Sequence, residues 1–198
     1  MKQPNGKVAT PIPAATVVPL RDGDDGVEIL LLRRNARLDF VGGAWVFPGG
    51  RLDEEDYAQA PGRDELIAAR HAAVREAHEE SGLTLALDQL VCLSHWTTPG
   101  SSPKRFATWF FLAPLSQPQQ VEIDGSEIHE HRWYRPQAAL DAYLRDEIFI
   151  IMPTYHTIEA LIGFADCAEL LAHYRNAAPT IVPPEHGKIM PLPTGRRH

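Results

Sequence analysis

The stretch from Trp45 to Leu83 reads WVFPGGRLDEEDYAQAPGRDELIAARHAAVREAHEESGL, and the rest of the chain is organised around it. Its second half predicts a helix that begins near Asp64 and ends near Gly82, because Asp is favoured at a helix start and Gly just after a helix end. Apolar residues recur there at helical spacing and form the stripe that should face a core. That stripe consists of Leu66, Ile67, Ala73, Val74 and Ala77.

Three glutamates lie close together on the same predicted helix. Glu76, Glu79 and Glu80 stand at positions i, i+3 and i+4, which places them within an arc of about 100°. At about 5 Å and an effective dielectric constant of about 20, each pair of carboxylates repels by roughly 3 kcal/mol. A divalent cation removes that repulsion, and all-oxygen ligands suit Mg²⁺ or Mn²⁺ better than Zn²⁺. The cluster therefore predicts a metal site; a solvated acidic face is the simpler alternative.

The residues before the helix predict a strand that breaks into a tight loop. An apolar run ends at Phe47 and Pro48, and Gly49 and Gly50 follow directly. Glycine has no Cβ, so the backbone of such a loop can approach another group closely. Residues 53–63, between this loop and the helix, contain Pro-Gly and are expected to form a further loop.

The loop and the helix together resemble the signature of the Nudix hydrolases. In that signature Gly, five residues, Glu and seven residues precede Arg-Glu-U-x-Glu-Glu-x-Gly-U, where U is bulky and aliphatic. The second half matches from Arg75 to Leu83, with the small Ala77 at one aliphatic position. The first half begins at Gly50, and Asp56 stands where the signature has its first Glu. Eighteen residues separate Asp56 from Arg75 instead of seven, so the chain carries an insertion of 11 residues.

This resemblance implies an α/β fold, namely the α/β/α sandwich of the family with a mixed central sheet and appended C-terminal helices. It also implies a hydrolase whose cofactor is Mg²⁺ or Mn²⁺. The metal ligands that it implies are Glu76, Glu79, Glu80 and a carbonyl of the Gly-Gly loop, here Gly49 or Gly50. Arg75 is expected to orient the neighbouring acids during catalysis, and an exposed cation is the alternative.

Three segments are expected along the chain. Residues 1–13 should be loose, residues 14–150 should form the Nudix-like domain, and residues 151–198 should pack on it as helices and a Pro-rich tail. Strands are predicted at 14–21, 27–34, 44–47, 90–97 and 105–115, with a strand pair at 121–123 and 128–134. Helices are predicted at 136–145, 153–161 and 165–175.

A further acid is predicted in the segment SEIHEHRWYRPQAAL, which begins at Ser126. Glu127 stands six residues before Trp133, and the segment resembles one in which many Nudix hydrolases place a ligand or base on a later strand or loop. Glu127 is therefore a catalytic candidate, and a plain surface glutamate is the alternative. His129 and His131 share its parity along an extended chain, and ordinary surface positions are expected for both.

Two pairs of basic residues are candidates for contacting a phosphate. Lys104 and Arg105 follow a loop of small residues and are predicted to bind substrate, with a solvated basic pair as the alternative. Arg33 and Arg34 end a predicted strand near the Gly-Gly loop. Because side chains alternate along a strand, only one of the two arginines can face the substrate, and Arg34 is predicted to be that residue.

Composition limits the classes of function. The 198-residue chain has 44% hydrophobic and 23% charged residues, as expected of a globular domain. Its net charge of −7 argues against non-specific nucleic-acid binding, which needs a basic surface. No apolar run approaches about 18 residues and no signal peptide is apparent, so neither a membrane span nor secretion is expected, and a cytoplasmic location is predicted. Cys92 and Cys167 are too few for a disulfide framework and are expected to be buried thiols.

The predicted reaction is hydrolysis of a diphosphate that links a nucleoside to another group. The stretches LLLRRNARLDFVGGAWVFPGGRLDEED and HWTTPGSSPKRFATWFF, with the interrupted signature, resemble the coenzyme A diphosphatase-like branch of the family. This implies coenzyme A or acyl-coenzyme A as substrate. Ala107 and Trp109 stand where that branch commonly has Asp and Arg, so ADP-ribose, NADH and nucleoside triphosphates are alternative substrates.

The expected mechanism is attack of a metal-activated water, with Glu79, Glu80 or Glu127 accepting its proton. A non-catalytic ligand sensor on the same scaffold is the remaining alternative, although such a module need not keep three repelling carboxylates. The expected partners are small molecules, and neither nucleic acid nor membrane. Dimers are frequent in the resembled family, so a homodimer is an expected assembly.

Overall fold

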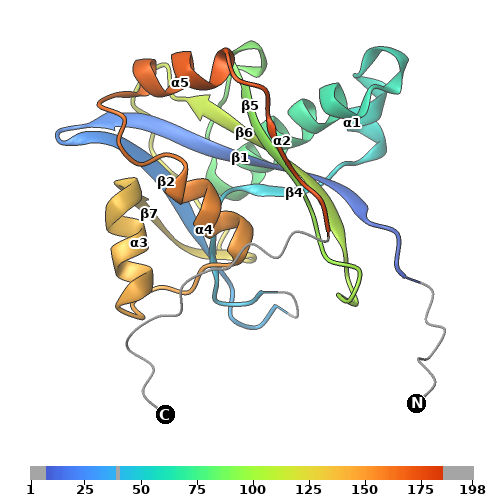
Figure 1. The fold of residues 1–198 in the computed structure, drawn as a ribbon, viewed down its shortest axis with the longest axis horizontal. Coiled ribbons are helices and arrows are strands. Elements are labelled where there is room, and N and C mark those ends of the chain that lie inside the picture. Colours follow the sequence, from blue (N-terminus) through green and yellow to red (C-terminus); the bar gives the residue numbers. More distant parts are fainter. Residues whose placement is uncertain (1–7, 39–40, 185–198) are drawn as a thin grey trace.

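A computed structural model describes residues 8–38 and 41–184 of the chain as a single mixed sheet between two layers of helices (Figure 1). The strands are β1 (Ile12–Gly23), β2 (Gly26–Arg34), β3 (Trp45–Val46), β4 (Gly49–Arg51), β5 (Val91–Thr97), β6 (Phe106–Pro114), β7 (Ile128–Tyr134) and β8 (Thr180–Val182). The helices are α1 (Glu54–Ala58), α2 (Glu65–Ser81), α3 (Pro136–Leu144), α4 (Met152–Glu159) and α5 (Cys167–Arg175), with short 3₁₀ turns η1 (Pro61–Arg63) and η2 (Leu87–Gln89).

The sheet has the order β3-β2-β1-β6-β5-β8, with β4 added to β1 and β7 added to β2. β1 runs parallel to β6 and antiparallel to β2. β1 and β2 pair only over Leu20–Gly23 and Gly26–Ile29, near their connecting turn. Beyond that point β4 pairs with β1 at residues 14–16, and β3 pairs with β2 at residues 32–33. The two central strands therefore have separate partners at their far ends, and Phe47 and Pro48 connect those partners. Gly49 and Gly50, which were predicted to form a loop, belong to β4 and pair with β1.

Each face of the sheet has its own hydrophobic core. One core joins the sheet to α2, and the other joins the opposite face to α3, α4 and α5, which lie together on one side of the sheet in Figure 1. The alternation of side chains along the strands supplies both cores, since Val17 packs in the first and Val18 in the second. The predicted α/β/α sandwich with a mixed sheet is confirmed.

Helix α2 is capped as its sequence predicts. The side chain of Asp64 accepts the N–H of Ile67 at 2.9 Å, and Gly82 ends the helix in the left-handed region with φ of 69°. The predicted apolar stripe is confirmed for Ala73 and Ala77, which are buried, and for the half-buried Leu66 and Val74, which pack against the same core. Ile67 is half-buried and belongs to neither core. The buried face is made mainly of alanines, namely Ala68, Ala69, Ala72, Ala73 and Ala77. Small side chains let the helix approach the sheet closely, and this brings its glutamates to the edge of the Gly-Gly loop.

The insertion is not the loop that was predicted for residues 53–63. It forms α1 and the turn η1. A capping box fixes the start of α1, in which the side chain of Asp56 accepts the backbone N–H of Asp53 at 2.8 Å. The Pro61-Gly62 pair predicted a break in regular structure, and the chain turns there after a complete helical turn has formed. The helix was missed because a five-residue helix has too few residues to show a hydrophobic period.

The predicted strand at residues 121–123 is also absent from the structure. The N–H of Glu122 donates to the carbonyl of Ser81 at 2.9 Å, and the side chain of Gln119 bonds to both backbone groups of Thr84. The backbone of this segment is therefore held by the C-terminal end of α2 and the residues after it, and Ile128–Tyr134 pairs with β2 instead.

The two ends of the described chain join the sheet. β1 begins at Ile12, inside the segment that was expected to be loose, and β8 pairs in parallel with β5 at one edge. The remainder of the expected loose N-terminus, residues 1–7, and of the Pro-rich tail, residues 185–198, lies outside the described residues. None of the helices in the described ranges has the length and apolar character needed to cross a membrane.

Candidate active site

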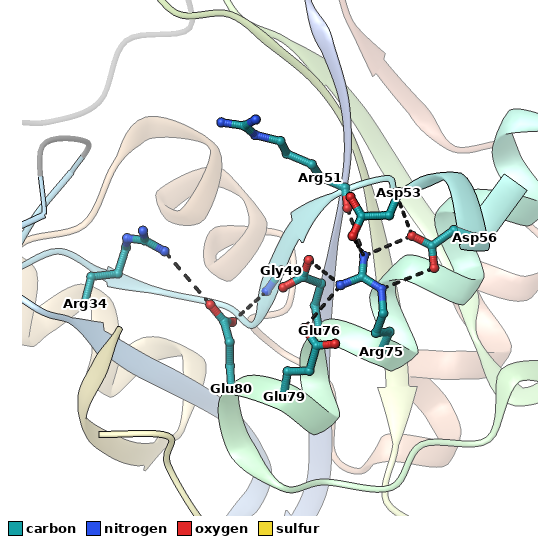
Figure 2. Close-up of polar contacts among 9 residues, drawn as sticks. All are labelled: Arg34, Gly49, Arg51, Asp53, Asp56, Arg75, Glu76, Glu79 and Glu80. Carbon is teal, nitrogen blue, oxygen red and sulfur yellow. Dashed lines mark hydrogen bonds and ion pairs between the residues drawn. The ribbon is translucent and has the colours of Figure 1, made fainter. Parts of the chain in front are cut away.

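The three glutamates of α2 differ sharply in their surroundings (Figure 2). The side chains of Glu76 and Glu80 are 16% and 9% exposed, whereas that of Glu79 is 56% exposed. Glu80 accepts the N–H of Gly49 at 3.0 Å. The carboxylate of Glu76 lies against Gly50 so closely that a Cβ there would come within 2.2 Å of its oxygen. Two of the predicted ligands thus meet consecutive glycines, and a larger residue at Gly50 would displace Glu76.

Arg75 lies at the centre of this group, and all three nitrogens of its guanidinium donate hydrogen bonds. It donates to Glu76 at 2.9 Å, to Glu79 at 3.2 Å and to Asp56 at 2.9 and 3.3 Å, and also to the backbone carbonyl of Arg51 at 3.0 Å. Burial by itself lowers the pKa of Arg75, but the bonds to Asp56 and Glu76 outweigh burial and raise that pKa. Its position between the acids is the one that an orienting role requires.

Asp56 is the site residue whose role the sequence left open. Its side chain is only 1% exposed, and it closes the start of α1 while accepting both bonds from Arg75. The spacing of five residues from Gly50 was the signal that marked this position. Although the insertion separates Asp56 from Arg75 by 18 residues, α1 returns the carboxylate to the arginine (Figure 2).

Substitution of Asp56 by alanine is expected to lower the free energy of unfolding by about 1–2 kcal/mol, because it removes a buried partner of a charged group. Activity should fall as well, since Arg75 would keep only Glu76 and Glu79 as side-chain partners at hydrogen-bond distance. Chemical denaturation and steady-state kinetics measure the two effects. Asp56→Asn keeps an acceptor for the backbone of Asp53 and should lose less stability; equal losses in both variants would contradict the role of the cap.

A second group of charges lies on the other side of Glu80. Arg34, at the end of β2, approaches Glu80 at 4.0 Å and Glu127 at 3.7 Å. The pairing of β2 with β7 shifts register between Arg33 and Arg34, a bulge of the kind that re-aims side chains. Arg33 points elsewhere and pairs with Glu130 at 3.3 Å, as the alternation predicted. The structure therefore brings Arg34 and Glu127 to the glutamates of α2.

The environment of Glu80 disfavours its charged form. Burial raises the pKa of Glu80 to about 8, and the negative charges of Glu76 and Glu127 act in the same direction. The N–H of Gly49 and the distant cation of Arg34 oppose this shift without cancelling it. A desolvated carboxylate that lacks a close cation is a group that gains from a bound metal ion.

Lys104 and Arg105 are not brought to this group. Arg105 is buried and donates to the backbone carbonyls of Thr98 at 3.0 Å and Ala9 at 2.7 Å, so its guanidinium joins the residue after β5 to the segment before β1. Lys104 lies over the ring of Phe106, 5.4 Å from its centroid. A phosphate-binding role for this pair has no support in the geometry. His129 and His131 are exposed on β7, as expected.

The chemistry of the donor set fits a hard divalent cation, because the carboxylates of α2 and the carbonyl of Gly50 supply only oxygen. Within residues 8–38 and 41–184, however, no three Asp, Glu, His or Cys side chains converge closely enough to hold an ion as they stand. Arg75 holds Glu76 and Glu79, while Glu80 turns to Gly49. A cavity of about 270 Å³ beside α3 borders none of these acids and is a different feature.

Comparisons with known proteins place this site in context. A family model described as the NUDIX domain matches residues 10–155. Acyl-coenzyme A diphosphatase NUDT19 is 23% identical in Xenopus laevis, with 72% of this chain and 62% of that protein covered. The human protein of that name is 25% identical, with 74% and 63% covered. A putative nudix hydrolase 7 of Caenorhabditis elegans is 26% identical, with 78% and 62% covered. The chain thus spans less than two thirds of the length of these relatives.

Among solved structures, a NUDIX hydrolase from Alicyclobacillus acidocaldarius superposes with a TM-score of 0.77. The match covers 89% of this chain and all of that chain, at 23% sequence identity. At this identity the likeness concerns the fold alone.

Proposed function

The chain belongs to the Nudix family, and from this premise we propose that it is a metal-dependent hydrolase that cleaves the diphosphate bond of a nucleoside diphosphate linked to another group. Nudix hydrolases generally use divalent metal ions. The observation that carries the proposal is the acid set itself: Arg75 holds Glu76 and Glu79, and Gly49 holds Glu80. Glu80 in turn approaches Arg34, which pairs with Glu127.

We assign the metal ligands to Glu76, Glu79, Glu80 and the carbonyl of Gly50. A Mg²⁺ or Mn²⁺ ion held by these residues would polarise the phosphate of the substrate and lower the pKa of a water molecule. Glu127 is mostly exposed and pairs with Arg34, so it is the candidate that can accept a proton from water. Arg34 provides a cation beside the same place and is proposed to contact a phosphate oxygen. Arg75 keeps the ligands in position.

We propose coenzyme A or acyl-coenzyme A as the substrate, supported by the relatives named as acyl-coenzyme A diphosphatases. A panel of coenzyme A, acyl-coenzyme A, ADP-ribose, NADH and nucleoside triphosphates, incubated with Mg²⁺ or Mn²⁺, tests this assignment. The products should be 3′,5′-ADP and a phosphopantetheine, identified by mass spectrometry. Preferential cleavage of ADP-ribose or NADH would replace the substrate while leaving the reaction class in place.

One observation favours a second candidate function, a non-catalytic ligand sensor. The described acids do not converge as a complete metal site, and Arg75 binds two of them. A titration with Mg²⁺ or Mn²⁺ followed by calorimetry separates the candidates, since the enzyme must bind the ion and the sensor need not. A cytoplasmic location and a homodimer stay part of the proposal, and light scattering measures the latter.

A further inference from the structure

A short loop before β7 is folded around one carboxylate. The side chain of Asp124 accepts the backbone N–H groups of Ser126 at 3.1 Å, Glu127 at 2.8 Å and Ile128 at 2.8 Å, and also accepts the hydroxyl of Ser126. Gly125 takes the left-handed conformation, with φ of 72°, that allows the chain to turn around the carboxylate. These bonds outweigh the effect of burial and lower the pKa of Asp124.

The same loop is tied to the residue that follows Arg34. The backbone N–H of Asn35 donates to the carbonyl of Glu127 at 2.7 Å, and its side-chain amide donates to the carbonyl of Ser126 at 3.0 Å. Arg34 itself faces Ile128 at the first paired position of β7, next to the bulge in β2. The main chains of Arg34 and Glu127 are therefore connected by several bonds.

We propose that Asp124 and Asn35 are positioning residues that hold Glu127 and Arg34 beside Glu80. This inference rests on the proposed function, in which Glu127 accepts a proton and Arg34 contacts a phosphate. The side chain of Glu127 is 58% exposed, and its ion pair with Arg34 spans 3.7 Å. The position of Glu127 therefore depends on its main chain, which the bonds to Asp124 and Asn35 hold in place. Misplacement of a catalytic group by about 1 Å can cost on the order of 100-fold in rate.

The test compares Asp124→Ala, Asp124→Asn, Glu127→Ala and the double variant Asp124→Ala/Glu127→Ala, using the full chain, Mg²⁺ and the compound that the substrate panel shows to be cleaved fastest. Asp124→Ala should lower kcat about 10- to 30-fold with KM changed less than about twofold. Both oxygens of Asp124 accept backbone N–H groups and asparagine keeps only one acceptor, so the kcat of Asp124→Asn should lie between those of Asp124→Ala and the parent. In the Glu127→Ala background, Asp124→Ala should cost no more than about a further twofold, because its effect passes through Glu127.

Asn35→Ala removes one of the two ties and should lower kcat about threefold, since the backbone bond remains. The matched control is Asp88→Ala, an exposed aspartate after α2, for which the kinetic constants should not change. Independent effects of Asp124→Ala and Glu127→Ala on kcat would overturn the proposal, as would an Asp124→Asn protein that is no faster than Asp124→Ala.

Hydrogen exchange provides a second measurement that needs no activity. The amides of Ser126, Glu127 and Ile128 should exchange at least about tenfold faster in Asp124→Ala, while those of β5 stay unchanged. Unchanged exchange in this loop would show that Asp124 does not hold it. If no compound of the panel is cleaved by the parent protein, the proposed function fails, and the exchange rates still decide whether Asp124 fixes Glu127.

Discussion

Simultaneous replacement of Glu79 and Glu80 by glutamine is expected to lower kcat by about 1000-fold, equivalent to about 4 kcal/mol of transition-state stabilisation, while the protein stays folded. Glutamine has nearly the same shape as glutamate, and the Gly49 N–H can donate to its amide oxygen as it does to Glu80. What the double variant loses is two negative charges from the proposed ligand set, and with them the affinity for the ion.

Single-turnover kinetics with varied Mg²⁺ measures this loss, and circular dichroism reports the fold. The matched control is Glu65→Gln at the start of the same helix, where Glu65 accepts a bond from Trp109 that a glutamine oxygen can also accept. That variant should keep its rate within about twofold of the parent. An active Glu79→Gln/Glu80→Gln protein would remove these residues from the catalytic assignment.

Replacement of Glu80 alone by glutamine is expected to stabilise the metal-free protein at pH 8, by about 4 kcal/mol. Burial raises the pKa of Glu80 from its ordinary value of 4.5 to about 8. Between these two values the folded state holds a proton that the unfolded state has released, so the free energy of unfolding falls as pH rises. The penalty is complete above pH 8 and absent below pH 4.5, and an uncharged glutamine removes it.

Urea denaturation in EDTA at pH 5, 6.5 and 8 measures this gain, which should grow steadily with pH. Glu79→Gln is the matched control, because Glu79 is mostly exposed and its ion pair with Arg75 is screened by water. That change should shift stability by less than about 0.5 kcal/mol at every pH. Added Mg²⁺ should stabilise the parent and not the Glu80→Gln protein. A gain that does not vary with pH would contradict the burial of a charged Glu80.

The sequence predicted α2 and its glutamates correctly because their determinants are local. Asp64 and Gly82 mark the two ends of the helix, and the spacing of Glu76 and Glu80 is one helical turn. Strand positions were predicted almost as well, since alternation and flanking Gly and Pro residues are also local signals. The sandwich and the family were predicted from the signature, which is longer than any single element.

The remaining features depend on contacts between distant residues. Asp56 reaches Arg75 only because α1 folds, and its burial cannot be read from a segment that contains mostly polar residues. Arg105 has the sequence context of a phosphate ligand, but backbone carbonyls far along the chain occupy it. The backbone of Glu122 bonds to Ser81 at the end of α2, and the side chain of Gln119 bonds to Thr84 just after it; only the tertiary fold brings these residues near. The domain boundaries and the roles of the site residues stay predictions.

Because the bonds between Asp56 and Arg75 hold α1 against α2, the length of the insertion does not affect the site that it interrupts. The turn at Pro61-Gly62 takes no part in these bonds, and Gly62 has open space around it. The positions of the catalytic residues therefore depend only on where the insertion begins and ends, and the turn at Pro61-Gly62 can change in length. A peptide epitope or a fluorophore inserted at this turn should therefore leave the catalytic residues in place.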